Sequence, residues 1–172
     1  RTGSNLSRHD ERLSLAFRRL YELGAPSSVL PFFMRLSVAV SEGKVSVLSA
    51  VRITEVIESF LVRRAVCGYE PTGLHKTVPW PGHDDFKTAI LTRPLYGAAV
   101  TKFLIAQYDK DLGGDAPSDI PFIEHILPQT LTPEWRRLFS EEEHLEMKDL
   151  LGNLLPLSGP MNAALGNRPF HQ

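Results

Sequence analysis

The chain has 172 residues, of which 42% are hydrophobic and 23% charged, so it can bury a core and need not stay disordered. Its single cysteine, Cys67, excludes a disulfide framework and a cysteine-rich zinc site, and no apolar run has the length of a membrane span. The net charge of −1 is unevenly distributed: residues 1–110 carry 15 basic and 10 acidic side chains, whereas residues 111–172 carry 4 and 10. This asymmetry fits a protein that binds phosphates with one part and a cation with the other, and a chance imbalance explains it equally well.

The first two thirds of the chain have the periodicity of helices. Apolar spacing predicts helices over residues 5–23, 28–40, 47–66 and 84–91, with a loop rich in Pro and Gly over 67–83. We expect the helix over 28–40 to be buried, and Pro94 to be the first residue of a further helix that ends at Gly113. The apolar stripe of the helix over 47–66 is expected to consist of Leu48, Val51, Val56, Ile57, Phe60 and Leu61.

The pattern of apolar residues changes after Pro117. Residues 120–127 are predicted to form a short strand, and residues 153–157 a second one. Between them we expect a helix that Thr132 caps and a second that begins at a capping box, Ser140 with Glu143, and runs to Leu151. A last short helix is expected over residues 160–166.

Four polar residues stand out in this region: Glu124 and His125 on the first strand, Asn153 before the second, and Asn162 in the last helix. If the strands pair antiparallel, the last helix brings Asn162 back beside Glu124 and His125. Carboxylate and amide oxygens suit Mg²⁺ or Mn²⁺, and a histidine can take a proton from water near neutral pH. Asn153 is expected to bond the backbone across the loop after His125 and hold the imidazole in place.

The order of elements predicts an α+β fold, mainly α: a helical bundle followed by a ββα-metal motif of the HNH, or His-Me finger, type. The helical portion is expected over residues 1–116 and the finger over 117–172, together forming one compact domain. Local spacing alone is also compatible with purely structural roles for these residues, because a histidine on a strand is more often packed in a core than catalytic. The asparagines likewise suit turns and helix caps.

Three sequence blocks resemble a known family. Residues 122–129, FIEHILPQ, resemble the (V/I)EHILPQ block of the C-terminal nuclease domains of GmrSD-type restriction enzymes, and the C-terminal domain of SspE, from phosphorothioate-based phage defence, is similar. Residues 151–162 resemble the family's LGNLTLLS…LN block, and residues 165–170 its L-x-N-x-x-F ending. Residues 60–67 resemble the ES(F/Y)xVRR helix that precedes the motif in this family. Two departures are Pro156, where the family usually has Leu, and the end at Gln172, where the family continues with a Lys-bearing helix.

The resemblance implies a metal-dependent DNA endonuclease of restriction or anti-phage defence in the bacterial cytoplasm. His125 would activate water, Asn162 and Glu124 would hold one Mg²⁺ or Mn²⁺, and Asn153 would organise the finger. The residues expected to contact DNA are Asn167, Arg168, Arg63 and Arg64.

We expect the chain to be a fragment of a longer protein. Its expected partners are DNA and the rest of the parent protein, including a nucleotide-dependent sensing domain, with no membrane and with a homodimer as one route to cutting both strands. The alternative is a non-catalytic DNA-binding or protein-interaction module that retains the fold. His144, among glutamates, suggests either a second metal site or a solvated helix face, and we favour the solvated face.

Overall fold

The computed structural model describes residues 3–70, 80–114 and 122–157, and it describes side chains from residue 11 onward. These residues form six α-helices and a two-stranded antiparallel sheet, so the predicted α+β, mainly α, fold class is confirmed. Contacts divide the chain into two compact units, residues 1–82 and 83–172. The domain boundary expected between residues 116 and 117 stays a prediction. No helix in the described part of the chain is long and apolar enough to cross a membrane.

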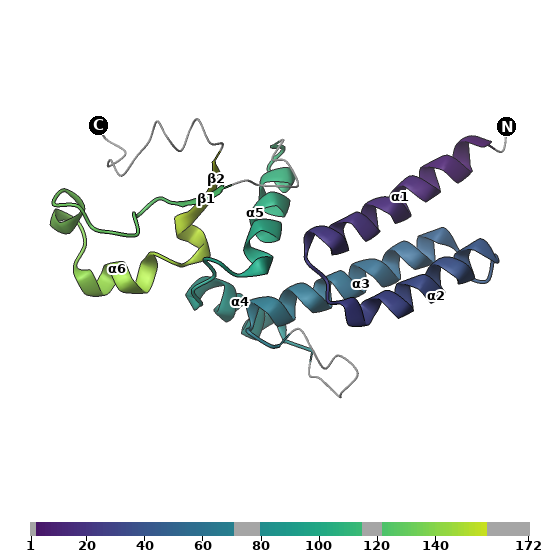
Figure 1. Ribbon diagram of the computed structural model, residues 1–172, viewed down its shortest axis with the longest axis horizontal. Helices are drawn as coiled ribbons and strands as arrows, with labels where there is room; N and C mark the ends of the chain where they lie inside the picture. The colour runs from purple at the N-terminus through teal and green to yellow at the C-terminus, as the bar shows by residue number, and fades with distance from the viewer. Residues whose placement is uncertain (1–2, 71–79, 115–121, 158–172) are drawn as a thin grey trace. The chain divides into compact units, whose positions relative to one another are not determined.

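The first unit is a bundle of three helices (Figure 1). They are α1 (Gly3–Glu22), α2 (Leu30–Ser41) and α3 (Val47–Val66). The α1 and α3 helices lie side by side, and a bidentate ion pair of Arg19 with Glu58, at 2.8 and 2.7 Å, joins them. The Ser46 side chain caps α3 by accepting a hydrogen bond from the Ser49 amide, which satisfies one of the free donors at the helix start.

The helices of the first unit were predicted in the right places, but their buried faces were predicted only in part. The expected stripe on α3 is partly right: Leu61 is buried and Val51, Ile57 and Phe60 are half-buried, but Leu48 and Val56 are exposed. Ala50 and Thr54, which are not part of the expected stripe, are fully buried. The buried residues of α3 thus include small ones, which the spacing of large apolar side chains does not reveal. The α2 helix is buried only along Phe33 and Leu36 and exposes most of its other apolar residues, so the expectation of a buried helix is wrong.

The second unit places the two strands against helices. Its elements are α4 (His83–Thr92), α5 (Ala99–Asp111), β1 (Phe122–His125), α6 (Glu141–Met147) and β2 (Leu154–Leu157). The strands pair antiparallel, with His125 opposite Leu154 and Ile123 opposite Pro156, which confirms the expected pairing. Leu154 packs against Ile105 and Ala106 of α5, so this helix supports the sheet.

Two helix limits differ from the prediction because residues at their ends make other bonds. Pro94 does not begin α5; it lies in a β-bridge with Leu150, and the helix starts at Ala99. The same bridge draws Leu150 out of the helix that was expected to reach Leu151, so α6 ends at Met147.

The connection between the strands has its own small core. The helix expected at Thr132 forms only a 3-10 turn, Trp135–Arg137, whereas the capping box of Ser140 and Glu143 at the start of α6 is present. Leu127, Leu131 and Trp135 form a buried cluster in this connection. The helix expected over residues 160–166 lies outside the described residues.

Candidate active site

His125 ends β1 and lies beside an acidic side chain. Its Nε2 is 3.2 Å from Oδ1 of Asp149, and the imidazole is 5% exposed. An ionised carboxylate can only accept a hydrogen bond, so Nε2 is the donor and carries the hydrogen. In the neutral tautomer that carries its hydrogen on Nε2, Nδ1 keeps its lone pair and can accept a proton.

The segment between α4 and α5 is hydrogen-bonded to the backbone of Asp149. The backbone oxygen of Asp149 accepts hydrogen bonds from the amides of Leu95, at 2.8 Å, and Tyr96, at 3.2 Å. The Tyr96 ring lies over the imidazole of His125, with the ring centroids 4.2 Å apart and an angle of 57° between the planes. Oδ2 of Asp149 is 3.7 Å from Nζ of Lys148. Among the residues that the structure describes, one carboxylate and one aromatic ring therefore contact the imidazole.

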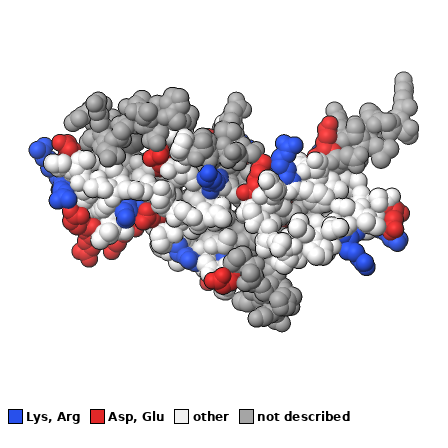
Figure 2. Space-filling model, in the orientation of Figure 1, with Lys and Arg blue, Asp and Glu red and all other residues white. Residues whose placement is uncertain are grey.

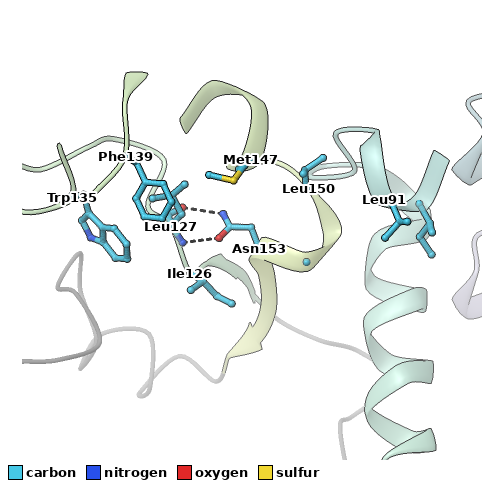
Figure 3. A pocket seen from close by; sticks show the side chains of 10 residues that line it. Leu91, Ile126, Leu127, Trp135, Phe139, Met147, Leu150 and Asn153 are labelled. Atoms are coloured by element: carbon cyan, nitrogen blue, oxygen red, sulfur yellow. Dashed lines mark hydrogen bonds between the residues drawn. The ribbon is translucent and has the colours of Figure 1, made fainter. Parts of the chain in front are cut away.

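Asn153 holds the loop after His125 to the segment before β2 (Figure 3). Its Oδ1 accepts a hydrogen bond from the Leu127 amide at 2.7 Å, and its Nδ2 donates to the Leu127 oxygen at 3.0 Å and the Lys148 oxygen at 2.7 Å. The Asn153 backbone oxygen accepts from the Ile126 amide at 2.9 Å. These contacts are those expected of a clamp across the loop, and they fix the chain immediately after the histidine.

The clamp lies at the edge of an apolar cavity of about 350 Å³. Figure 3 shows Leu127, Trp135, Phe139 and Met147 around Asn153. The side chains that line the cavity are mostly apolar, so they offer few hydrogen bonds that compete with the clamp.

The described residues do not complete a metal site. Among them, no group of three or more His, Cys, Asp or Glu side chains is close enough to hold an ion. Glu124 pairs with Leu155 on β2, and successive strand residues point to opposite faces of a sheet, so Glu124 and His125 leave β1 on different sides. The expected ligand Asn162 lies outside the described residues, and the roles of Glu124 and Asn162 at a metal stay predictions.

The residues expected to contact DNA are spread over the chain. Asn167 and Arg168 lie outside the described residues. Arg63 and Arg64 belong to the first unit, where Arg63 donates to the oxygens of Pro81 and Gly82. Arg64 is 4% exposed, lies against two aromatic rings and donates to a backbone oxygen, so it has almost no surface to offer a phosphate. The expected DNA contact therefore finds no support at Arg64 and stays a prediction at Arg63.

The preference for a solvated His144 is wrong. The residue is 5% exposed, and its Nε2 lies 2.8 Å from the backbone oxygen of Pro128. Four glutamates share its helix, but they lie on the outer face, whereas His144 faces the loop after β1. His144 is thus a structural residue that ties α6 to this loop.

The sequence pattern did not indicate two neighbours of His125, which are Asp149 and Tyr96. Asp149 immediately precedes the LLGN segment that carries the clamp, and this position was its only local signal. Tyr96 lies 29 residues before His125, in a segment that was read as the first turn of a helix. Neither Asp149 nor Tyr96 lies at a helical or strand spacing from His125, because these contacts form between segments that are distant in the sequence.

The comparisons with known proteins bear on the second unit. Residues 80–172 match the family model described as "GmrSD restriction endonucleases, C-terminal domain", which covers more than half of the chain and all of the second unit. Searches of curated proteins and of solved structures found no match. The similarity to SspE stays a prediction. The matched residues include His125, Asp149 and Asn153, and the chain belongs to the family of GmrSD restriction endonuclease C-terminal domains.

Proposed function

We propose that the second unit hydrolyses phosphodiester bonds of DNA in the restriction of foreign DNA, with His125 as the general base. Membership of a restriction endonuclease family supports the reaction class. The observation that carries the assignment of the base is the hydrogen bond between His125 Nε2 and Asp149 Oδ1, because it leaves the other ring nitrogen able to accept a proton. Removal of a proton from water by a positioned base contributes roughly 10²- to 10⁴-fold to a hydrolytic rate.

The other residues of the site have positioning roles. Asp149 holds the imidazole in one tautomer and stabilises the imidazolium that forms when Nδ1 takes the proton. Asn153 fixes the loop that follows the base. After the reaction, the proton on Nδ1 returns to solvent or to the leaving 3′ oxygen.

A divalent ion would complete the chemistry, and its donors are those expected from the sequence. An amide oxygen at Asn162 and a carboxylate at Glu124 are hard oxygen donors, which fit Mg²⁺ or Mn²⁺. Glu124 leaves β1 on the side opposite His125, so its geometry does not support a ligand role at an ion beside this histidine. When bound, the ion would neutralise charge on the phosphoryl and leaving oxygens of the substrate. Asp149 is assigned to the histidine, because its Oδ1 is already within hydrogen-bond distance of the ring.

The charge distribution limits how DNA can approach. Figure 2 shows acidic side chains gathered over α6, where Glu141, Glu142, Glu143 and Glu146 are exposed. Such a surface repels the phosphate backbone, so we propose that DNA binds away from α6. Binding through the backbone predicts weak sequence preference and affinity that falls steeply with salt. The cytoplasmic location, the sensing domain and a homodimer stay predictions.

A cleavage assay on supercoiled plasmid tests the proposal. The chain should nick DNA with Mg²⁺ or Mn²⁺ and not with EDTA, and His125→Ala should lower the rate by roughly 10²- to 10⁴-fold. Asp149→Asn should also lower the rate, because an amide can donate to Nε2 and favour the wrong tautomer. The matched controls are His83→Ala and Asp84→Asn, which change the same residue types at exposed positions of α4.

The burial of the imidazole favours a second reading, in which His125 is a structural residue of a DNA-binding module. In that case the chain would bind DNA without cutting it, and His125→Ala would lower the free energy of unfolding. Measuring DNA affinity and urea unfolding of the same variants separates the two functions. Cleavage by His125→Ala at the wild-type rate would refute the proposed base.

A further inference from the structure

We infer that Tyr96 is a positioning residue for His125: its ring packs against one side of the imidazole, fixes its plane and shields that side from solvent. This inference rests on the proposed function only for its effect on cleavage, since the covering itself is a property of the fold. The 4.2 Å between ring centroids is direct ring contact, so the imidazole cannot rotate freely without displacing the tyrosine. Tyr96 itself is 44% exposed, so it forms the boundary between the imidazole and solvent.

The backbone around Tyr96 is built to hold the ring in this position. The Ala98 amide donates to the Leu95 oxygen at 3.1 Å, which closes a four-residue turn. Gly97 has φ of 80°, the positive value that a type II turn requires at its third position, and Tyr96 occupies the second. A side chain on residue 97 would strain this turn, so glycine is the residue that lets the tyrosine point at His125.

The turn is also anchored on both sides. Leu95 is buried, and its oxygen accepts a hydrogen bond from the hydroxyl of Thr101, which is fully buried in α5. On the other side, the amides of Leu95 and Tyr96 donate to the backbone of Asp149, the residue whose carboxylate bonds His125. The backbone hydrogen bonds to Asp149 therefore hold the Tyr96 ring and the Asp149 carboxylate in place relative to each other, and both contact the imidazole of His125.

This arrangement assigns Tyr96 an effect on the chemical step rather than on DNA binding. A base that tilts away from its productive geometry by about 1 Å costs up to 10²-fold in rate. Tyr96→Ala should therefore lower kcat roughly 10- to 100-fold and leave KM little changed.

Chemical modification of the histidines measures the covering directly and needs no enzymatic activity. Diethyl pyrocarbonate acylates accessible neutral imidazoles, and peptide mass spectrometry gives the rate at each histidine of the full chain. In the wild type, His125 and His144 should both react slowly, because the His125 side chain and the whole His144 residue are each 5% exposed. Tyr96→Ala should raise the rate several-fold at His125 and leave His144 unchanged, and Tyr96→Phe, which keeps the ring, should restore protection.

The controls separate a local effect from unfolding. Tyr108→Ala removes a tyrosine that is exposed on α5 of the same unit and should leave both histidines protected. If Tyr96→Ala leaves His125 as slow as in the wild type, or exposes His125 and His144 alike, the ring does not position the base and the inference is overturned. A chain that never cleaves DNA but shows selective exposure of His125 would refute the proposed function and keep the covering by Tyr96.

Discussion

Replacing Asn153 by alanine should destabilise the second unit by an amount that follows from its hydrogen bonds. The side chain makes three, two with the Leu127 backbone and one with the Lys148 oxygen. Each such bond contributes about 1 kcal/mol net, so Asn153→Ala should lower the free energy of unfolding by about 3 kcal/mol. Leu127 is 5% exposed, so water cannot fully replace the hydrogen bonds that its backbone loses. Solvent therefore reduces the expected loss of stability only slightly.

Urea unfolding followed by tryptophan fluorescence measures this loss. Trp135 is buried beside the clamp, whereas Trp80 belongs to the first unit, so a Trp80→Phe background makes the signal specific to the second unit. For a unit of this size, about 3 kcal/mol corresponds to a fall in Tm of roughly 12–24 °C. Gln129→Ala, which changes an exposed amide in the same loop, is the matched control and should stay within about 0.5 kcal/mol of wild type.

The aspartate variant sharpens the test, because it keeps the size of the side chain and the acceptor for the Leu127 amide. Asn153→Asp turns a carboxylate oxygen toward the two backbone oxygens that the amide nitrogen now bonds, so it should destabilise the unit at neutral pH at least as much as alanine does. Protonation of this carboxylate at low pH should recover part of the loss. A loss below about 1 kcal/mol for Asn153→Ala would mean that the three bonds are worth little, and the clamp would no longer explain how the loop after His125 is held.

Two further substitutions test the surroundings of the site. His144→Ala should cost about 2–4 kcal/mol, because it leaves a cavity and an unpaired Pro128 oxygen, and unfolding within about 0.5 kcal/mol of wild type would restore the solvated reading of this residue. Hydrogen bonds from the Ser140 backbone amide and hydroxyl hold the pKa of Glu143 below its ordinary value of 4.5. A lowered folded-state pKa stabilises the protein above the unfolded-state pKa, and this stabilisation is lost as the pH falls through the folded-state pKa. The extra stability of wild type over Glu143→Ala in urea unfolding should therefore be present at pH 7 and shrink below about pH 4.5; a difference that does not change between pH 7 and pH 3 would contradict the capping box as its source.

The elements of this chain could be predicted from sequence where the signal is local. The limits of α3, the capping box of α6 and both strands follow from patterns within a few residues. The clamp of Asn153 could also be anticipated, since an asparagine after a glycine suits a tight connection between segments. The faces of the helices were harder, because Ala50 and Thr54 are buried for their small size and not for their hydrophobicity.

The partners of His125 could not be predicted because they depend on contacts between distant segments. Asp149 is indistinguishable in the sequence from a solvated aspartate at the end of a helix. Its place is set by the bridge of Pro94 with Leu150 and by the amides that bind its backbone oxygen. The place of Pro94 could not be predicted for the same reason, since a proline at a helix start and a proline in a bridge have the same local sequence pattern until the partner segment is known.

Residues 148–153 therefore connect stability to chemistry in one short segment: Asp149 bonds the base, Leu150 bridges to Pro94, and Asn153 clamps the loop. A domain with a typical stability of about 5–15 kcal/mol remains mostly folded after a loss of about 3 kcal/mol. Asn153→Ala should thus keep most molecules folded at 25 °C and still cleave DNA more slowly than its folded fraction predicts. Cleavage in proportion to the folded fraction would instead show that Asn153 acts on stability alone, and that the sheet and Asp149 suffice to hold His125.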